Sequence, residues 1–310
     1  MSSVTQPLAV PRPGVASLLR DYSELTKARV TTLIVMTAWT GAFFGAAKSG
    51  LPLVSWTLFH ALLGIGLVSG GTAAMNEVIE RESDARMRRT AIRPLVTGSM
   101  SLGHGMVVSL VMMIGGAGYL GLMTNWLTAA LALMTSVVYL MAYTPLKKIH
   151  PICTTIGAFP GAMPPVLGWT AIRGHLGWEA VALFAILFFW QFPHFHSIAW
   201  LYRDDYANAG IRMLPVVERD GRSTAREIVI YAAFLLPITL TPFLLRFAGR
   251  IYFLAALVLG SMLFWVSLRM FTMNLAPSSP HSKKYARQLL LASVTYLPLL
   301  FAVMMLDRTI

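Results

Sequence analysis

Long apolar stretches separated by short polar ones run from residue 29 to residue 306. A helix needs roughly 17–25 apolar residues to cross the hydrocarbon core of a bilayer, and nine stretches meet that requirement. These are residues 29–47, 54–76, 104–123, 126–143, 154–172, 178–199, 228–245, 251–271 and 287–306. The longest polar interruptions, 77–101 and 202–227, are too short for a separate soluble domain. The pattern predicts an all-α membrane protein of about nine transmembrane helices, with a single membrane domain over residues 26–310.

Composition agrees with this pattern and excludes a soluble protein. Hydrophobic residues make up 56% of the chain, charged residues 12%, and the mean hydropathy is +0.65. A soluble domain normally carries about 25% charged residues, because its surface has to be solvated. The one cysteine, Cys153, excludes an intrachain disulfide and a cysteine metal cluster, and we interpret it as a packed residue.

The basic residues orient the predicted helices. Segments rich in lysine and arginine stay in the cytoplasm, and with the N-terminus inside, 20 of the 25 lysines and arginines fall on the cytoplasmic side. The five on the other side are Lys48, Arg173, Arg246, Arg250 and Arg308. This distribution predicts a cytoplasmic N-terminus and a periplasmic C-terminus. It also accounts for the net charge of +12 without a nucleic-acid partner.

The first 25 residues contain several prolines and no apolar core of signal-peptide length. We expect residues 1–25 to form a flexible cytoplasmic tail. Asp21 and Glu24 disfavour a mitochondrial presequence, since such peptides are poor in acidic residues. The chain is therefore expected in a bacterial inner membrane, as a multi-pass protein in the lipid bilayer.

Three side chains with oxygen donors lie four residues apart where the second apolar stretch ends. Asn76, Glu80 and Asp84 share one face of a helix, because residues at i, i+4 and i+8 are neighbours on its surface. Clustered hard oxygens suit Mg²⁺, which binds one or two carboxylates together with substrate phosphates. The stripe predicts a metal site, and the alternative interpretation is an ordinary solvated end of a charged helix.

Basic residues follow this stripe and recur at the end of the fourth apolar stretch. Arg89 and Arg93 are again four apart, and guanidinium groups suit a diphosphate. Lys147 and Lys148 come after Pro145, which ends the helix at the membrane surface. They would bind phosphate, or would simply extend to the interface as lysines near helix ends do.

Glycine and proline mark places where helices approach or break. Three prolines and three glycines fall within residues 157–169, inside a predicted span. A broken backbone at membrane depth is tolerated only where protein or a cavity satisfies it, so this segment predicts a binding cavity. Small-residue spacings such as Gly41xxxGly45 predict close helix contacts.

The sixth apolar stretch carries His194 and His196 and leads into the polar segment 202–210. Polar side chains within a span are costly and often functional. His194 either contacts a substrate or an iron, or is a hydrogen-bonded structural histidine. Asp204 and Asp205 form a second acidic point that would complete a metal site with the stripe, or would pair with a nearby arginine such as Arg203.

Together these motifs resemble the haem branch of the UbiA-type intramembrane prenyltransferase superfamily. The similarity lies in residues 25–30, 76–94, 143–169 and 190–215, with 285–287 and 293–298 near the C-terminus. The asparagine and acid stripe is typical of the superfamily, and 190–215 is the part similar to the haem branch. The resemblance implies a UbiA-type helical bundle. The motifs and the resemblance together predict catalytic roles for Asn76, Glu80, Asp84, Arg89, Arg93 and Lys147. The predicted metal ligands are Asn76, Glu80, Asp84 and Asp205. The predicted substrate-binding residues are Lys27, Arg29, Tyr143, Lys148, His194, Tyr202, Arg203, Asp204, Asp205 and Tyr206.

Some positions depart from the superfamily pattern. Glu80 stands where an aspartate is usual, and Ala28 replaces a common proline. Tyr202 and Tyr206 occupy the spacing at which most relatives place the two aspartates of a second metal motif. The second-site ligands are therefore open, with Asp205 preferred over Asp204.

The activity that the resemblance implies is transfer of a farnesyl group from farnesyl diphosphate to a vinyl group of haem b, with Mg²⁺ as cofactor. Haem A synthase or the assembly of a terminal oxidase would receive the product. Two alternatives stand beside it: prenyl transfer to a quinone or chlorophyll precursor, and a transporter or haem-binding membrane protein without catalysis. The segment 190–215 argues against the first. An acid stripe followed by paired arginines argues against the second.

Overall fold

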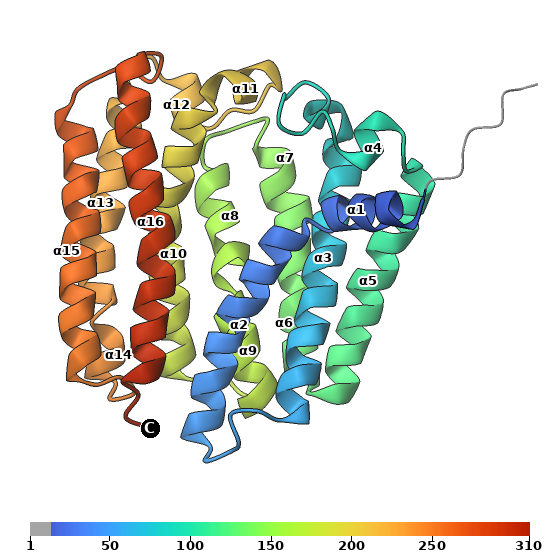
Figure 1. Ribbon diagram of the computed structural model, residues 1–310, viewed down its shortest axis with the longest axis vertical. Helices are drawn as coiled ribbons and strands as arrows, with labels where there is room; N and C mark the ends of the chain where they lie inside the picture. The colour runs from blue at the N-terminus through green and yellow to red at the C-terminus, as the bar shows by residue number, and fades with distance from the viewer. Residues whose placement is uncertain (1–13) are drawn as a thin grey trace, which may run out of the picture.

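The computed structural model describes residues 14–310. Within them the regular elements are all helices, joined by turns and loops, and there is one isolated antiparallel bridge between Ala248 and Arg308. Long helices stand side by side as a bundle, and short ones gather at one end of it (Figure 1). The C-terminus lies at the opposite end from α4, α7, α11 and α12. The all-α fold predicted from the apolar pattern is confirmed.

Eight helical stretches of the described chain are long and apolar enough to cross a membrane. They are α2 (Ala28–Lys48), α3 (Trp56–Asp84), α5 (Leu102–Met123), α6 with η1 and α7 (Trp126–Val137, Val138–Tyr143 and Thr144–Leu146), α10 (Trp178–Leu201), α13 with α14 (Arg222–Ile238 and Thr241–Leu244), α15 (Arg250–Thr272) and α16 (Pro280–Leu306). Side chains such as Val111 and Val258 face outward from the bundle, as expected of a surface that contacts lipid. The shorter helices are α1 (Val15–Leu25), α4 (Pro94–Thr97), α11 (Arg203–Asn208) and α12 (Leu214–Val217).

The fifth predicted crossing, residues 154–172, is made of two half-length helices. α8 (Cys153–Ala162) and α9 (Pro164–Arg173) meet at Met163, where the consecutive prolines Pro164 and Pro165 supply no backbone N–H. Most of α9 is buried, so neighbouring helices rather than lipid surround the break. The helix break predicted for residues 157–169 is confirmed.

Capping residues fix where several spans begin. Ser55 precedes α3, and its hydroxyl accepts the N–H of Leu58 at 3.1 Å. Ser101 and Asn125 cap α5 and α6 in the same way. Each cap satisfies one backbone donor that the first helical turn leaves free. At the end of the bundle away from α4, an ion pair between Lys48 and Glu179 joins α2 to α10.

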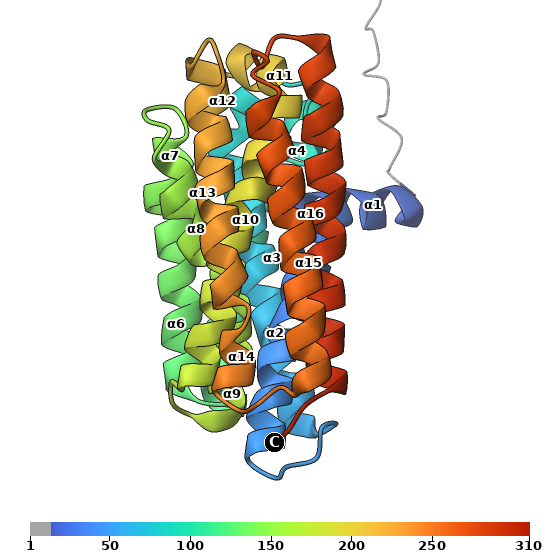
Figure 2. The same cartoon turned by 90° about the vertical axis from the view of Figure 1, so that its left-hand side faces the viewer.

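Residues 15–25 differ from the expectation of a flexible tail. They form α1, which runs across the bundle rather than along it (Figures 1 and 2). Leu25 is fully buried with Ala74, Leu95 and Met100, which secures the end of the helix to the domain. The rest of the predicted tail, residues 1–13, lies outside the described residues.

Glycines allow α2 and α9 to touch through their backbones. A Cβ on Gly41 would lie 1.8 Å from the carbonyl oxygen of Pro165, and one on Gly168 would lie 1.8 Å from that of Ala38. No side chain fits between the two helices at these points. The close contact predicted from the Gly41xxxGly45 spacing is confirmed at Gly41.

We predict that Gly41→Ala destabilises the protein, because the added methyl group has to push α9 away from α2. Overpacking of this kind costs about 1–3 kcal/mol. Gly118→Ala on α5 is the matched control, since a Cβ there meets nothing within 4 Å. Thermal unfolding of both variants in lipid nanodiscs is the measurement, and equal midpoints would contradict the backbone contact.

Candidate active site

The predicted acid stripe lies on the last turns of α3 and is buried. Asn76, Glu80 and Asp84 expose 0%, 8% and 1% of their surface. An ordinary solvated helix end would leave these side chains in water, so that alternative is excluded. Buried carboxylates require cations or hydrogen-bond donors beside them, and three other parts of the chain supply these.

The first donor comes from the joint between α1 and α2. Lys27 Nζ donates to Asn76 Oδ1 at 2.7 Å, and Asn76 Nδ2 donates to Thr144 Oγ1 at 3.1 Å. Lys27 has a left-handed backbone with φ of +47°, which is unfavourable for a residue other than glycine. Burial, together with the charges of Arg93 and Lys147, lowers the pKa of Lys27 to about 8.

The second cation comes from the turn that follows η1 and α7. Lys147 is buried, and its Nζ donates to both carboxylate oxygens of Glu80 at 2.8 and 3.1 Å. The same ammonium lies 4.5 Å from the centre of the Tyr143 ring. Residues 138–143 form a π-helix, a local widening of the helix that is frequent at functional sites. Lys147 and Tyr143 therefore lie at the site beside the stripe on α3. The alternative that the Lys147 side chain simply extends to the membrane interface does not fit its burial.

The third cation is Arg93, which folds back onto α3. Its Nη1 donates to Asp84 Oδ2 at 2.5 Å, and its Nε lies 3.2 Å from Glu77 Oε1. Residues 85–93 are a series of turns, with Thr90 Oγ1 donating to the carbonyl oxygen of Asp84. Their spacing of four therefore does not place Arg89 and Arg93 on one helical face, because this segment is not a helix. Arg89 instead lies 5.7 Å from the centre of the Tyr202 ring on the other side of the site.

Glu77 belongs to this cluster, although sequence reasoning did not select it. It is 1% exposed, and neither carboxylate oxygen accepts a hydrogen bond, since the Arg93 N–H is not aligned with Oε1. A buried acid with no hydrogen bond is costly and marks a site of function or ligand binding. Glu77 stands three residues before Glu80 and seven before Asp84, so it shares their helical face, and this i, i+3, i+7 spacing was the signal that could have found it.

The segment around α11 contributes two tyrosines, Tyr202 and Tyr206. Of the two predicted acidic residues, Asp204 and Asp205, it buries only Asp205, and only in part. Tyr206 is buried, and burial raises the pKa of its hydroxyl, while the charges of Arg89 and Lys147 act in the opposite direction. Asp204 is exposed and pairs with Arg203 at 3.6 Å and with Lys283 at 3.5 Å. The ion-pair alternative is therefore confirmed for Asp204, while Asp205 is half-buried.

Other predicted residues lie at the edge of the site or apart from it. Arg29 and Lys148 are exposed, and Arg203 Nε donates to the carbonyl oxygen of Pro215 in α12. The backbone N–H of Arg212 donates to the carbonyl oxygen of Lys147, which ties the loop after α11 to the Lys147 turn. In residues 14–310 no three His, Cys, Asp or Glu side chains converge as a ready metal cage.

The two histidines of α10 face different neighbours. His194 stacks on Trp190 with ring centres 4.7 Å apart, and its Nδ1 lies 3.0 Å from Ser293 Oγ on α16. His196 is buried and its Nε2 lies 3.0 Å from Glu227 on α13. With Nδ1 engaged by a hydroxyl, His194 keeps Nε2 as the nitrogen for a ligand.

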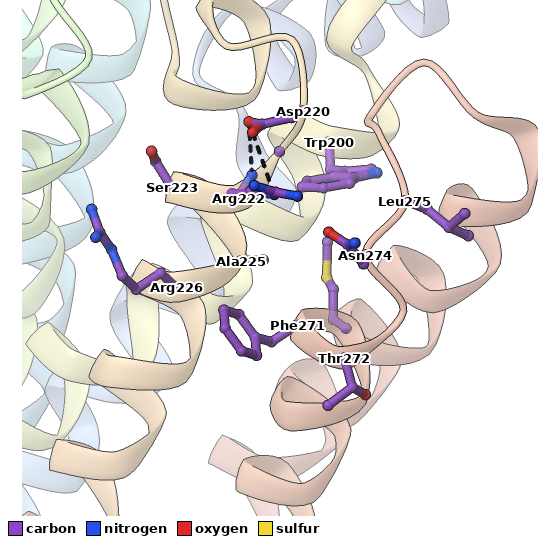
Figure 3. A pocket seen from close by; sticks show the side chains of 12 residues that line it. Trp200, Asp220, Arg222, Ser223, Ala225, Arg226, Phe271, Thr272, Asn274 and Leu275 are labelled. Atoms are coloured by element: carbon purple, nitrogen blue, oxygen red, sulfur yellow. Dashed lines mark hydrogen bonds and ion pairs between the residues drawn. The ribbon is translucent and has the colours of Figure 1, made fainter.

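A separate pocket of about 380 Å³ opens between the start of α13 and the end of α15. Figure 3 shows Arg222 in its mouth, paired with Asp220, with Trp200 and Asn274 alongside. The first backbone N–H groups of α13 already donate to Asp220 and Glu218. The carboxylates of Asp220 and Glu218 therefore already occupy the Arg222 cation and the N–H donors that a phosphate would need. The acid cluster, which consists of Asn76, Glu77, Glu80 and Asp84, contributes no residue to the lining of this pocket.

Comparison with known proteins finds matches over nearly the whole chain. The sequence profile of the UbiA prenyltransferase family matches residues 34–305. A protoheme IX farnesyltransferase of Solibacter usitatus is 45% identical over 300 residues, covering 94% of this chain and 99% of the relative. One of Bordetella pertussis is 40% identical over 304 residues, covering 97% of each.

Solved structures share the fold at much lower identity. A digeranylgeranylglyceryl phosphate synthase superposes with a TM-score of 0.76 at 14% identity, covering 94% of this chain and 98% of that one. A UbiA homolog from Archaeoglobus fulgidus bound to GPP and Mg²⁺ superposes with a TM-score of 0.61 at 18% identity, covering 92% and 99%. The bundle predicted from the sequence is therefore a known membrane fold.

We predict that Glu77→Gln impairs whatever reaction this cluster performs by at least about tenfold, the scale of one misplaced contact to developing charge. The amide keeps the size of the side chain and removes the charge that Arg93 faces. Glu82→Gln is the control, because Glu82 lies on the exposed side of the same helix. Comparable turnover of the two variants would make Glu77 a structural residue.

Proposed function

This chain belongs to the UbiA prenyltransferase family, and we propose that it transfers the farnesyl group of farnesyl diphosphate to a vinyl group of haem b, with addition of water, giving haem O and diphosphate. The observation that carries the proposal is the buried cluster on α3 in which Arg93 and Lys147, from other segments, pair with three carboxylates. A third cation, Lys27, donates to Asn76 beside them. Relatives that match almost their full length are protoheme IX farnesyltransferases.

The residues of the cluster fit a magnesium ion. Glu77, Glu80 and Asp84 offer hard oxygen donors, and the Glu77 oxygens accept no hydrogen bond. Mg²⁺ in proteins usually takes one or two carboxylates and completes its shell with phosphate and water, so no preformed cage is required. Asn76, Glu80 and Asp84 would hold the ion, with Asp205 as the candidate from α11. When bound, Mg²⁺ neutralises the charge that develops on the departing diphosphate.

The cations would change partners when the substrate binds. Lys147 and Arg93 now pair with Glu80 and Asp84, and a diphosphate would attract both away from these carboxylates. Arg89, which stacks over Tyr202 and is exposed, lies at the mouth of the same site. Preorganised cations of this kind favour breaking of the bond between C1 and oxygen by stabilising the leaving group.

Carbon chemistry then proceeds without a covalent nucleophile from the protein. Electrons of the haem vinyl group form the new bond to C1 of the farnesyl chain as the C1–O bond breaks. Water adds to the resulting cation and loses a proton, which leaves a hydroxyl group. The Tyr139 and Tyr143 rings, 5.1 Å apart beside Lys147, offer aromatic faces to the allylic cation.

Haem is proposed to lie against α10 and α16, where His194 hydrogen-bonds to Ser293. The protein is a multi-pass membrane protein. We further infer that it lies in a bacterial inner membrane with the acid cluster on the cytoplasmic side, because 20 of the 25 basic residues belong there. The product would pass to haem A synthase or to terminal oxidase assembly.

The central test is incubation of the protein in nanodiscs with haem b, farnesyl diphosphate and Mg²⁺, followed by mass analysis of the extracted haems. We expect a haem enlarged by one farnesyl group and one hydroxyl group. Asp84→Asn should lower turnover at least about a hundredfold, because it removes one metal ligand and the partner of Arg93. Unchanged turnover in that variant, or in excess EDTA, would refute the magnesium site.

His194→Ala is expected to weaken haem binding or turnover about tenfold or more while leaving farnesyl diphosphate binding unchanged, since the diphosphate site lies on other helices. His175→Ala, in the exposed loop before α10, is the control. Haem titration followed by its absorption spectrum measures the difference. Normal haem affinity, spectrum and product formation would reduce His194 to a packing residue.

Orientation is tested with a reporter fused after Ile310. The distribution of basic residues predicts that a periplasmic reporter, such as alkaline phosphatase, is active there. Activity of a cytoplasmic reporter at the same position would place the acid cluster on the opposite face.

A further inference from the structure

Helix α1 has an apolar face that the rest of residues 14–310 leaves uncovered. Val15 and Leu19 are 75% and 66% exposed, and Leu18 and Tyr22 are exposed beside them. These four residues share one face of the helix, following the i, i+3, i+4, i+7 pattern. Arg20 and Glu24 lie on the opposite face and are also exposed. One stripe is thus apolar and the other charged.

The position of α1 indicates what covers this face. The helix lies across the spans near the end of the bundle that carries the acid cluster, and projects beside it (Figures 1 and 2). Its chain continues directly into α2, whose side chains Val30 and Leu33 are exposed where a span contacts lipid. The apolar stripe of α1 is therefore continuous with the lipid-facing surface of the domain. A helix of this kind, with an apolar stripe and a charged stripe, lies in the plane of a membrane interface.

The other end of α1 leads into the site. Leu25 is buried, Thr26 Oγ1 donates to the carbonyl oxygen of Tyr22, and Lys27 follows with its left-handed backbone. Tyr22 OH also lies 2.6 Å from His104 Nε2 on α5. Only one residue, Thr26, separates the last residue of α1 from the lysine that holds Asn76. The angle between α1 and α2 therefore determines where the Lys27 ammonium lies.

We propose that α1 is an interfacial membrane helix, with Val15, Leu18, Leu19 and Tyr22 among the acyl chains, and that its contact with lipid holds Lys27 against Asn76. The bilayer thereby helps to fix the position of Lys27 in the active site. The functional half of this proposal rests on the proposed prenyl transfer, whereas the membrane contact does not.

The membrane contact is tested with spin labels in lipid nanodiscs. Cys153 is the one cysteine of the chain and is buried, so Cys153→Ala gives a background for single-cysteine variants. Nitroxides placed by Leu18→Cys and Leu19→Cys should collide with oxygen more than with a water-soluble nickel chelate. Those placed by Arg20→Cys and Glu24→Cys should show the reverse. Equal access of the nickel chelate to all four positions would overturn the proposal.

The link to the site is tested with two paired substitutions. Leu18→Ser with Leu19→Ser should lower turnover at least about fivefold, because losing the burial of even one leucine shifts such an equilibrium by more than that. Leu18→Phe with Leu19→Phe should keep turnover within about twofold, since fluid lipid accepts any apolar side chain whereas a packed protein surface does not. Arg20→Gln with Ser23→Ala, on the polar side of α1, is the control.

The outcomes separate the two proposals. If the phenylalanine pair fails as the serine pair does, α1 packs against protein and the proposal is wrong. Full activity of the serine pair would refute the proposal that lipid contact by α1 holds Lys27 in place. Failure of the wild-type protein to form haem O would refute the proposed function, yet the spin-label result would still decide whether α1 lies in the membrane. Thermal unfolding of each variant separates loss of folding from loss of the contact.

Discussion

Charge balance in a buried cluster is the constraint on which the site depends. Glu77, Glu80 and Asp84 are removed from water on one helix, and isolated buried carboxylates would be strongly destabilising. Three cations from distant segments offset them: Lys27, Arg93 and Lys147. Each cation is placed at the site by a different connection. These connections are the joint before α2, the turns over residues 85–93 and the turn after α7. These connections are long or unusual because each has to reach the same end of α3.

The same balance explains how a closed, paired cluster is compatible with catalysis. Glu80 and Asp84 are each held by a cation that also suits phosphate, so a magnesium diphosphate can exchange partners with them without leaving an unpaired charge in a low dielectric. Glu77 is the exception, because its oxygens accept no hydrogen bond and its one charged neighbour is misaligned. The unfavourable free energy of burying the Glu77 carboxylate without a hydrogen bond would be relieved when a magnesium diphosphate binds.

Local periodicity predicts much of this arrangement, and long-range contacts account for the rest. The spans were predictable because a bilayer imposes a length and an apolar composition on each helix. The stripe of Asn76, Glu80 and Asp84 was predictable because the four-residue spacing persists along α3. The turn geometry that separates Arg89 from Arg93 depends on tertiary contacts such as Thr90 with Asp84, which no spacing rule contains. Helix α1 was missed because prolines before residue 14 suggested a tail, although Val15, Leu18, Leu19, Tyr22 and Leu25 carry a helical pattern. Only the fold could show that Lys27 reaches Asn76.

The backbone contact between α2 and α9 has a mechanical consequence. With the carbonyl oxygen of Pro165 seated against Gly41 and that of Ala38 against Gly168, the two helices have no side-chain layer between them that can rearrange. These direct backbone contacts hold α2 and α9 in register at two points, and the Lys48–Glu179 ion pair links α2 to α10 as well. Any widening of the bundle that admits a molecule as large as haem therefore has to occur at other helix boundaries.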